Sequence, residues 1–168
     1  MATLTQGAVL GAALFVLTAC GSDSPGTGRP CTLIGSLPGV GVDIRPPFAA
    51  RVASASLRVC WNGTCRRPRI ELSPSSTSVS TGCDGGELDA ACGASASPDG
   101  GKTGFARVTG LPKKPVRIFL VLRDARGRKL LDRRVGLTPK PSFPNGPHCG
   151  EGDPQAGLVV AGGRITVR

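Results

Sequence analysis

The feature that most strongly limits how this chain can fold is its set of seven cysteines, in a sequence with few large apolar residues. The 168 residues include 25 glycines and 15 prolines, and 39% of the chain is hydrophobic. Gly and Pro together make up about a quarter of the chain, which lies near the boundary at which chains stay disordered. We therefore expect covalent cross-links to supplement a marginal hydrophobic core.

One cysteine, Cys20, stands apart from the other six because it follows an apolar run over residues 8–19. That run is shorter than the roughly 20 residues of a membrane-spanning helix. It has the length of the hydrophobic region of a signal peptide. The stretch LTAC, ending at Cys20, resembles a bacterial lipobox. An ordinary secretory signal with an incidental cysteine is the alternative.

The lipobox resemblance implies that residues 1–19 are a lipoprotein signal peptide and that the Cys20 thiol is acylated. The protein would then be extracytoplasmic and anchored by lipid to the cell membrane. Residues 20–30 consist mainly of Gly, Ser, Pro and Thr, a composition that favours a flexible tether. The folded domain is expected over residues 31–168, a length typical of one domain.

The six remaining cysteines predict up to three disulfides, because an oxidising compartment favours an even set of cross-links. Their spacings, with a single histidine in the chain, fit no common zinc site. Asn62-Gly63 is a strong signal for a two-residue hairpin turn, and it places Cys60 opposite Cys65. Alternation then puts Trp61 on the core side of the strand and the Cys60–Cys65 bridge on the outer side.

The other pairings are less constrained. Cys83–Cys92 would close a loop of ten residues, which a loop-entropy model values at about 2–3 kcal/mol. Cys31–Cys149 would join the two cysteines left over, and it would tie the start of the domain to its last third. Other connectivities of these four cysteines stay open at this point.

The residue pattern of most of the domain predicts short strands separated by turns. Alternation or apolar runs predict strands over residues 40–44, 52–61, 64–72, 116–122, 130–137, 158–161 and 165–167. The segment 73–102 is rich in Ser, Gly and Asp, and its part before residue 91 is expected to be a long loop. Near its end, residues 91–97 and 103–108 flank PDGG like a further hairpin. No mature segment has a sustained helical period, so the fold class is all-β, an antiparallel sandwich of about seven or eight strands.

The stretch FARVTGLPKKPVRIFLVLRDARGRKL, residues 105–130, resembles part of immunoglobulin-like and fibronectin type III domains. In those families an apolar strand, a corner and a long alternating strand follow one another. The resemblance implies a disulfide-stabilised immunoglobulin-like β-sandwich. The tyrosine of the family's corner is missing, and Val116 stands near its place. The whole chain also resembles small secreted lipoproteins of actinobacteria, a likeness that supplies no active-site residue.

The formal net charge of +10 indicates an anionic partner, which could be an envelope polymer, lipid headgroups or an acidic protein face. The candidate patch comprises Arg123, Arg126, Arg128, Lys129, Arg133 and Arg134. Smaller clusters are Arg66, Arg67 and Arg69, and Lys113, Lys114 and Arg117. The alternative is a solvated surface that keeps the protein soluble. Nucleic acid is not expected as the partner, because one Trp and no Tyr offer few stacking platforms.

Residues for catalysis are scarce. His148 is the one histidine, so a nucleophile–base pair would rest on it alone. Asp84, Glu87 and Asp89 do not have the spacing of an EF-hand loop. We therefore expect no cofactor, no metal and no enzymatic activity. The favoured function is a lipid-anchored binding module of the cell envelope. An envelope-associated hydrolase and a purely structural lipoprotein are the alternatives, and the oligomeric state is left open.

Overall fold

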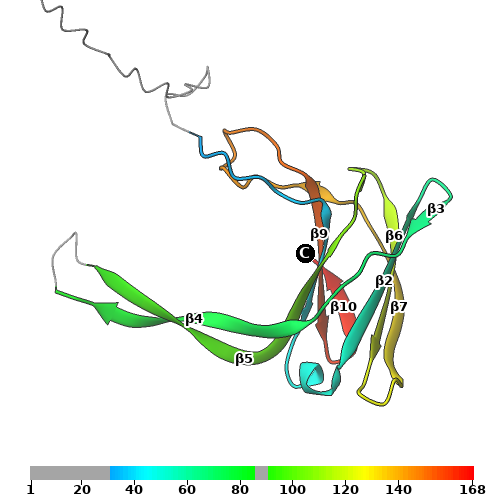
Figure 1. Ribbon diagram of the computed structural model, residues 1–168, viewed down its shortest axis with the longest axis horizontal. Coiled ribbons are helices and arrows are strands. Elements are labelled where there is room, and N and C mark those ends of the chain that lie inside the picture. The colour runs from blue at the N-terminus through cyan, green and yellow to red at the C-terminus, as the bar shows by residue number, and fades with distance from the viewer. Residues whose placement is uncertain (1–30, 86–90) are drawn as a thin grey trace, which may run out of the picture. The chain divides into compact units, whose positions relative to one another are not determined.

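The strand predicted over residues 116–122 lies inside a four-stranded antiparallel sheet of the computed structural model, which describes residues 31–85 and 91–168 (Figure 1). This strand, β6 (Val116–Arg123), alternates between buried and more exposed residues. It pairs with β2 (Ser54–Trp61) on one side and β7 (Lys129–Leu137) on the other, and β3 (Thr64–Arg66) lies beyond β2. The side chains that alternate outward from β6 are available for a functional surface.

The second sheet has six strands in the described part of the chain, and it is mixed. Its order is β10-β9-β1-β5-β4, with β8 paired to β9. Strands β1 and β9 run parallel, and the other neighbours are antiparallel. The strands span β1 (Gly39–Ile44), β4 (Ser73–Cys83), β5 (Cys92–Arg107), β8 (Lys140–Pro141), β9 (Pro154–Ala161) and β10 (Arg164–Val167).

A single buried cluster contains side chains from both sheets. Its fully buried members include Val40, Val42 and Leu158 of the six-stranded sheet, and Ile118 and Leu120 of the four-stranded sheet. Burying a Val, Leu or Ile side chain contributes about 1.5–3 kcal/mol. A short 3-10 helix, η1 (Phe48–Arg51), adds Phe48 and Ala49 to the same cluster. The buried hydrophobic side chains of the described residues are thus concentrated between the inner faces of the two sheets.

The hairpin predicted at Asn62-Gly63 joins β2 to β3. Both turn residues have positive φ, 47° and 76°, as a type I′ turn requires. Cys60 and Cys65 face each other across the hairpin and form a disulfide with an Sγ–Sγ distance of 2.04 Å. Trp61 is half-buried and packs against the core cluster, whereas Cys60 is buried outside that cluster. Strand β3 is shorter than the predicted strand 64–72, because it ends at Arg66 and residues 67–72 lie outside the strands.

The expectation of a long loop between residue 73 and residue 91 is wrong over residues 73–83, whereas the strand predicted over residues 91–97 is confirmed within the first part of β5. Residues 73–83 and the first part of β5 form a two-stranded antiparallel ribbon that projects from the rest of the strands (Figure 1). We call Ser76–Cys83 and Cys92–Pro98 the β4–β5 arm. A disulfide joins Cys83 to Cys92 near the end of the arm. The residues of the arm are exposed except Ser97, which is half-buried.

The hairpin expected around PDGG is also wrong, because these residues lie within β5. Ser76 pairs with Pro98 and Pro74 pairs with Lys102, so three residues of β5 stand opposite Ser75 alone. Asp99 Oδ1 accepts hydrogen bonds from Ser75 Oγ at 2.5 Å and from Gly101 N at 2.8 Å, and it fixes this bulge. The turn-forming residues therefore bend a continuous strand where the β4–β5 arm begins.

The described residues are all-β and disulfide-stabilised, with ten strands rather than seven or eight. The prediction of a wholly antiparallel arrangement is wrong at one place, the parallel pairing of β1 with β9. Thr32–Arg168 form one compact unit. Cys31 and Cys149 are each disulfide-bonded, and their pairing with each other stays a prediction. Cys20, the signal peptide 1–19 and the tether 20–30 lie outside the described residues.

Candidate functional site

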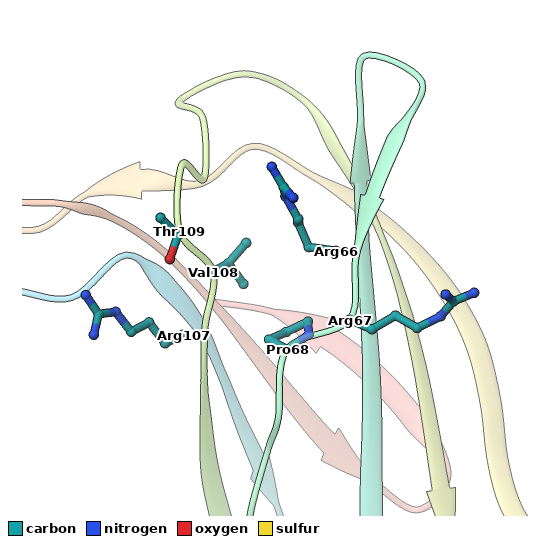
Figure 2. A pocket seen from close by; sticks show the side chains of 6 residues that line it. All are labelled: Arg66, Arg67, Pro68, Arg107, Val108 and Thr109. Carbon is teal, nitrogen blue, oxygen red and sulfur yellow. The ribbon is translucent and has the colours of Figure 1, made fainter.

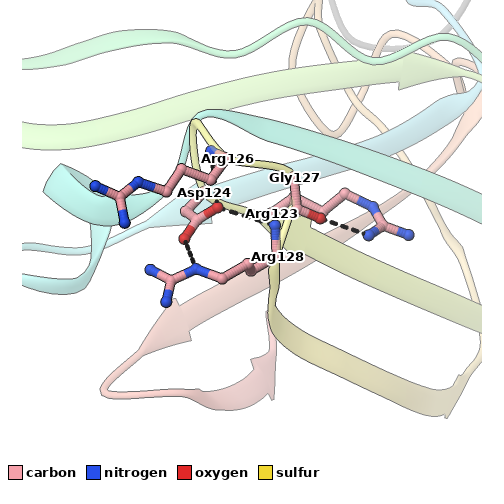
Figure 3. A network of polar contacts seen from close by, with 5 residues as sticks. All are labelled: Arg123, Asp124, Arg126, Gly127 and Arg128. Carbon is pink, nitrogen blue, oxygen red and sulfur yellow. Dashed lines mark hydrogen bonds and ion pairs between the residues drawn. The ribbon is translucent and has the colours of Figure 1, made fainter.

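The turn between β6 and β7 uses part of the predicted basic patch for its own structure (Figure 3). Asp124 Oδ1 accepts hydrogen bonds from the backbone N–H groups of Arg126 and Arg128, both at 2.9 Å. Asp124 Oδ2 accepts a third from Arg128 Nε at 2.7 Å. The Arg123 guanidinium donates to the carbonyl oxygen of Gly127 at 2.8 Å. Arg123 and Arg128 are therefore engaged within the turn.

These contacts also set the protonation of Asp124. Partial burial by itself raises the pKa of the Asp124 carboxyl, but the hydrogen bonds from Arg128 and Arg126 outweigh burial and hold the pKa below its usual value. On β7, the Asp132 carboxylate accepts a hydrogen bond from Lys129 Nζ at 2.6 Å, and this contact lowers the pKa of Asp132. The positive charge of Lys129 is thereby partly compensated by Asp132.

The six residues of the predicted patch do not share one face. Side chains alternate along a strand, so the neighbours Arg133 and Arg134 of β7 point to opposite sides of the sheet. Arg133 pairs in register with buried Leu120 and lies on the core side at the sheet edge, although it is exposed. Arg134 pairs with Phe119 and lies on the outer side. The patch is therefore divided between the turn, the edge and the outer face.

The outer face of the four-stranded sheet instead gathers arginines from three strands. Arg58 of β2, Phe119 of β6 and Arg134 of β7 form one row across the sheet. The Arg58 guanidinium carbon lies 4.1 Å from the centroid of the half-buried Phe119 ring, a cation–π contact. Arg117 is two residues from Phe119 on β6 and shares its face. We call Arg58, Arg117, Phe119 and Arg134 the arginine face.

The arginines of this face have no carboxylate partner in the described ranges. The ion pairs seen there join Asp43, Asp124, Asp132, Glu71 and Glu151 to other basic residues. Arg58, Arg117 and Arg134 are thus available to an external anion. Planar guanidinium groups suit bidentate contacts with carboxylate or phosphate. The four described strands of this sheet contain one acidic residue, Asp132, which lies two residues from Arg134 and is paired with Lys129.

An open hollow of about 540 Å³ adjoins the arginine face. Cys60, Arg117 and Gly136 form the row of the sheet next to it. Gly136 has nothing within 4 Å of the position that a Cβ would occupy, so this end of the row is unfilled. Trp61 and Leu137 supply apolar lining. The lining of the hollow thus includes the aromatic ring of Trp61, the aliphatic side chain of Leu137 and the positive charge of Arg117.

A second cationic hollow of about 370 Å³ is lined by Arg66, Arg67, Pro68, Arg107, Val108 and Thr109. Figure 2 shows that its three guanidinium groups point in different directions, with Arg67 and Arg107 directed away from each other. An anion placed in this hollow would not contact all three. The arrangement is a weaker candidate than the arginine face, although two members of the sequence cluster Arg66, Arg67 and Arg69 lie in it.

The remaining candidate residues lie apart. His148 is exposed in the segment between β8 and β9, beside disulfide-bonded Cys149. Lys113 forms an ion pair with Glu151, and Lys114 is exposed. Asp84 is exposed, and Glu87 and Asp89 lie outside the described residues. Within residues 31–85 and 91–168, no group of three His, Cys, Asp or Glu side chains could hold a metal ion.

Alternation along β2 places Arg58 on the same outer side as Cys60, but no pattern in the sequence singles out Arg58 with Arg117 and Arg134. What brings them together is the register of β2 with β6 and of β6 with β7. Among the described residues, no helix is long and apolar enough to cross a membrane. No protein-family model, no curated protein and no solved structure matches this chain.

Proposed function

We propose that this protein is a non-enzymatic binding module of the bacterial cell envelope, anchored by a lipid on Cys20. Its domain, of immunoglobulin-like type in this proposal, binds an anionic envelope polymer or an acidic protein surface through the arginine face. The single observation that carries the proposal is the row Arg58–Phe119–Arg134, with Arg117 beside it and no carboxylate partner for these arginines in the described ranges.

The physical argument rests on charge and shape together. A net charge of +10 draws an anionic partner from any direction, whereas three arginines on a rigid sheet hold it at one place. The half-buried ring of Phe119 orients Arg58, which lowers the conformational entropy lost on binding. The hollow lined by Trp61 and Leu137 offers an apolar contact next to Arg117. A partner with carboxylates or phosphates on a partly apolar frame fits this surface.

The test compares two triple variants of the full chain with the otherwise unmodified chain, all in a Cys20→Ser background so that lipid insertion does not hide the contact, for binding to isolated bacterial cell envelopes stripped of their own copy. Arg58→Ser/Arg117→Ser/Arg134→Ser removes the arginine face. The matched control, Arg45→Ser/Arg69→Ser/Arg164→Ser, removes the same charge from exposed positions off the four-stranded sheet. We expect the first variant to bind at least tenfold more weakly and the control within about threefold of the unmodified chain.

Salt separates a shaped site from diffuse attraction. Exposed charges are largely screened beyond a Debye length, about 8 Å at physiological ionic strength. We expect the difference between the two variants to persist at that ionic strength. Equal weakening of both variants, with binding that vanishes as salt rises, would overturn the arginine face as the site and leave only the net charge.

A further inference from the structure

The β4–β5 arm is an exposed two-stranded ribbon whose outer strand edge has no partner in the described structure. In the order β10-β9-β1-β5-β4, strand β4 is the last member. All residues of β4 from Ser76 to Cys83 are exposed. An isolated two-stranded ribbon is marginally stable in water, and a third strand with its hydrogen bonds stabilises it. The arm therefore presents backbone N–H and C=O groups to an added strand.

Charge distinguishes the edges of the arm from the other sheet edges of the described chain. Proteins protect exposed edges with charged side chains, most often lysine. The edge strand β3 carries Arg66, β7 carries Lys129, Arg133 and Arg134, and β10 carries Arg164. Strand β4 has the sequence SPSSTSVSTGC, and the facing part of β5 reads CGASASP, without a charged residue in either.

This contrast favours a second copy of the same chain as the occupant. Two molecules that each carry +10 repel each other over most of their surfaces. At β7, β3 or β10, edge-to-edge contact would bring like charges together, which is destabilising. At β4 two copies meet through uncharged side chains. The arm is therefore a part of the described surface where self-association encounters little charge repulsion.

The sequence of β4 is also compatible with antiparallel pairing to itself. Residues Ser76–Ser80 keep a regular register with β5, which gives a stretch of five residues free of bulges. A two-fold axis at Ser78 would place Thr77 opposite Val79 of the second copy, and Ser76 opposite Ser80. These small and β-branched pairs fit side by side, and hydroxyl pairs add hydrogen bonds. Val79 is 46% exposed and would be covered in part by the partner.

We propose that two copies of this chain associate through their β4 edges, antiparallel about a two-fold axis near Ser78. The product is a four-stranded sheet in the order β5-β4-β4-β5. Such a contact uses the same surface on both copies and closes on itself, so it yields a dimer rather than a filament. The arginine face lies on the other sheet, so this inference does not depend on the proposed function.

The test places a photo-reactive diazirine amino acid at Ser80 of the full chain, produced in bacterial cells in two differently tagged forms. Illumination is expected to give a product that carries both tags and has twice the mass of one chain. The control places the same probe at Thr166, which is exposed on the β10 edge, and is expected to give at least tenfold less product. Equal yields from the two positions, no two-tag product, or capture of a different protein at Ser80 would overturn the proposal.

A charge exchange then tests the register. Thr77→Lys/Val79→Lys and Thr77→Glu/Val79→Glu each place like charges across the two-fold axis, so each variant alone is expected to lose at least nine-tenths of the two-tag product. Mixing the two variants pairs lysine with glutamate, and the product is expected to return. A variant that cross-links alone as well as the unmodified chain, or a loss that the mixture does not restore, contradicts the pairing of β4 with β4.

Discussion

Asp124 illustrates how one carboxylate can organise a turn among arginines. It accepts hydrogen bonds from two backbone N–H groups and from the Arg128 side chain, and its pKa lies below the ordinary value of 3.8. A folded-state pKa below the unfolded value means that the carboxylate stabilises the folded state above about pH 4. This stabilisation is lost as the pH falls through the lower folded-state pKa. The turn is therefore expected to be acid-sensitive.

The variant Asp124→Ala tests this coupling. We expect it to unfold at a lower urea concentration than the unmodified chain near pH 7, because three hydrogen-bond donors lose their acceptor. The difference is expected to shrink as the pH falls below about 4, where the unmodified chain loses the charge as well. Urea unfolding curves at several pH values measure it. The control is Asp84→Ala, at an exposed position next to Cys83, for which we expect no change in the urea concentration of unfolding. If the stability difference between Asp124→Ala and the unmodified chain did not depend on pH, the role of the Asp124 charge would be contradicted.

At the scale of strands and ribbons, the β4–β5 arm should behave as a separate cooperative unit. Its residues do not belong to the core cluster, so the Cys83–Cys92 disulfide stabilises the arm rather than the whole domain. In Cys83→Ser/Cys92→Ser we expect the global free energy of unfolding to change by less than about 0.5 kcal/mol. Amide exchange over residues 76–80 is expected to accelerate at least tenfold, since closing a ten-residue loop contributes about 2–3 kcal/mol. Native-state hydrogen exchange measures both quantities.

The other hairpin disulfide gives the contrasting case. Cys60 is 5% exposed, and its neighbours Val59 and Trp61 contact the core cluster. We expect Cys60→Ala/Cys65→Ala to lower the global free energy of unfolding by about 2 kcal/mol, at the lower end for a disulfide. If the Cys83–Cys92 variant lowered global stability by as much, the arm would not be an independent unit.

The same contrast explains which strands could be predicted from the sequence. Strand β6 was predictable because one of its faces is buried, and burial produces alternating apolar residues. Strand β4 gave no such signal, since neither face of the arm is covered and Ser, Thr and Gly satisfy both, whereas residues 91–97 were predicted as a strand from their place beside PDGG. PDGG has the residues of a turn, and the same conformational freedom serves a bulge, with Gly100 at a φ of 73°. The parallel pairing of β1 with β9 joins segments distant in the chain, for which no local pattern exists.

The arginine face, like the strand pairings, could be predicted from the sequence only in part. Alternation predicts which side of its own strand each of Arg58, Arg117 and Arg134 occupies. It does not predict which residues of neighbouring strands lie opposite, because register depends on hydrogen bonding between strands and on the fit of the buried face. Alternation within one strand also divides contiguous clusters, such as Arg133-Arg134, between two sides. The arginine face is assembled from residues far apart in the chain and could be recognised only once the register was known.

For the whole molecule, the odd number of cysteines means that lipid attachment at Cys20 and the pairing of the other cysteines depend on each other. The chain has seven cysteines, an odd number, so they cannot all form disulfides within one molecule. Cys60–Cys65 and Cys83–Cys92 use four, and Cys31 and Cys149 are each disulfide-bonded. If the lipid occupies the Cys20 thiol, as the lipobox resemblance implies, Cys20 cannot form a disulfide, and Cys31 and Cys149 have only each other.

Thiol counting on the full chain purified from bacterial membranes tests this link. We expect no thiol to react with an alkylating reagent before reduction and six to react after it, because a thioether at Cys20 does not respond to reductants. Peptides from a digest without reductant should contain Cys31 joined to Cys149. In Cys20→Ser the six thiols should remain, while the protein moves from the membrane fraction to the soluble fraction. Seven reactive thiols after reduction would instead mean that Cys20 is not acylated, and the membrane anchor and the argument for the Cys31–Cys149 pairing would then fail together.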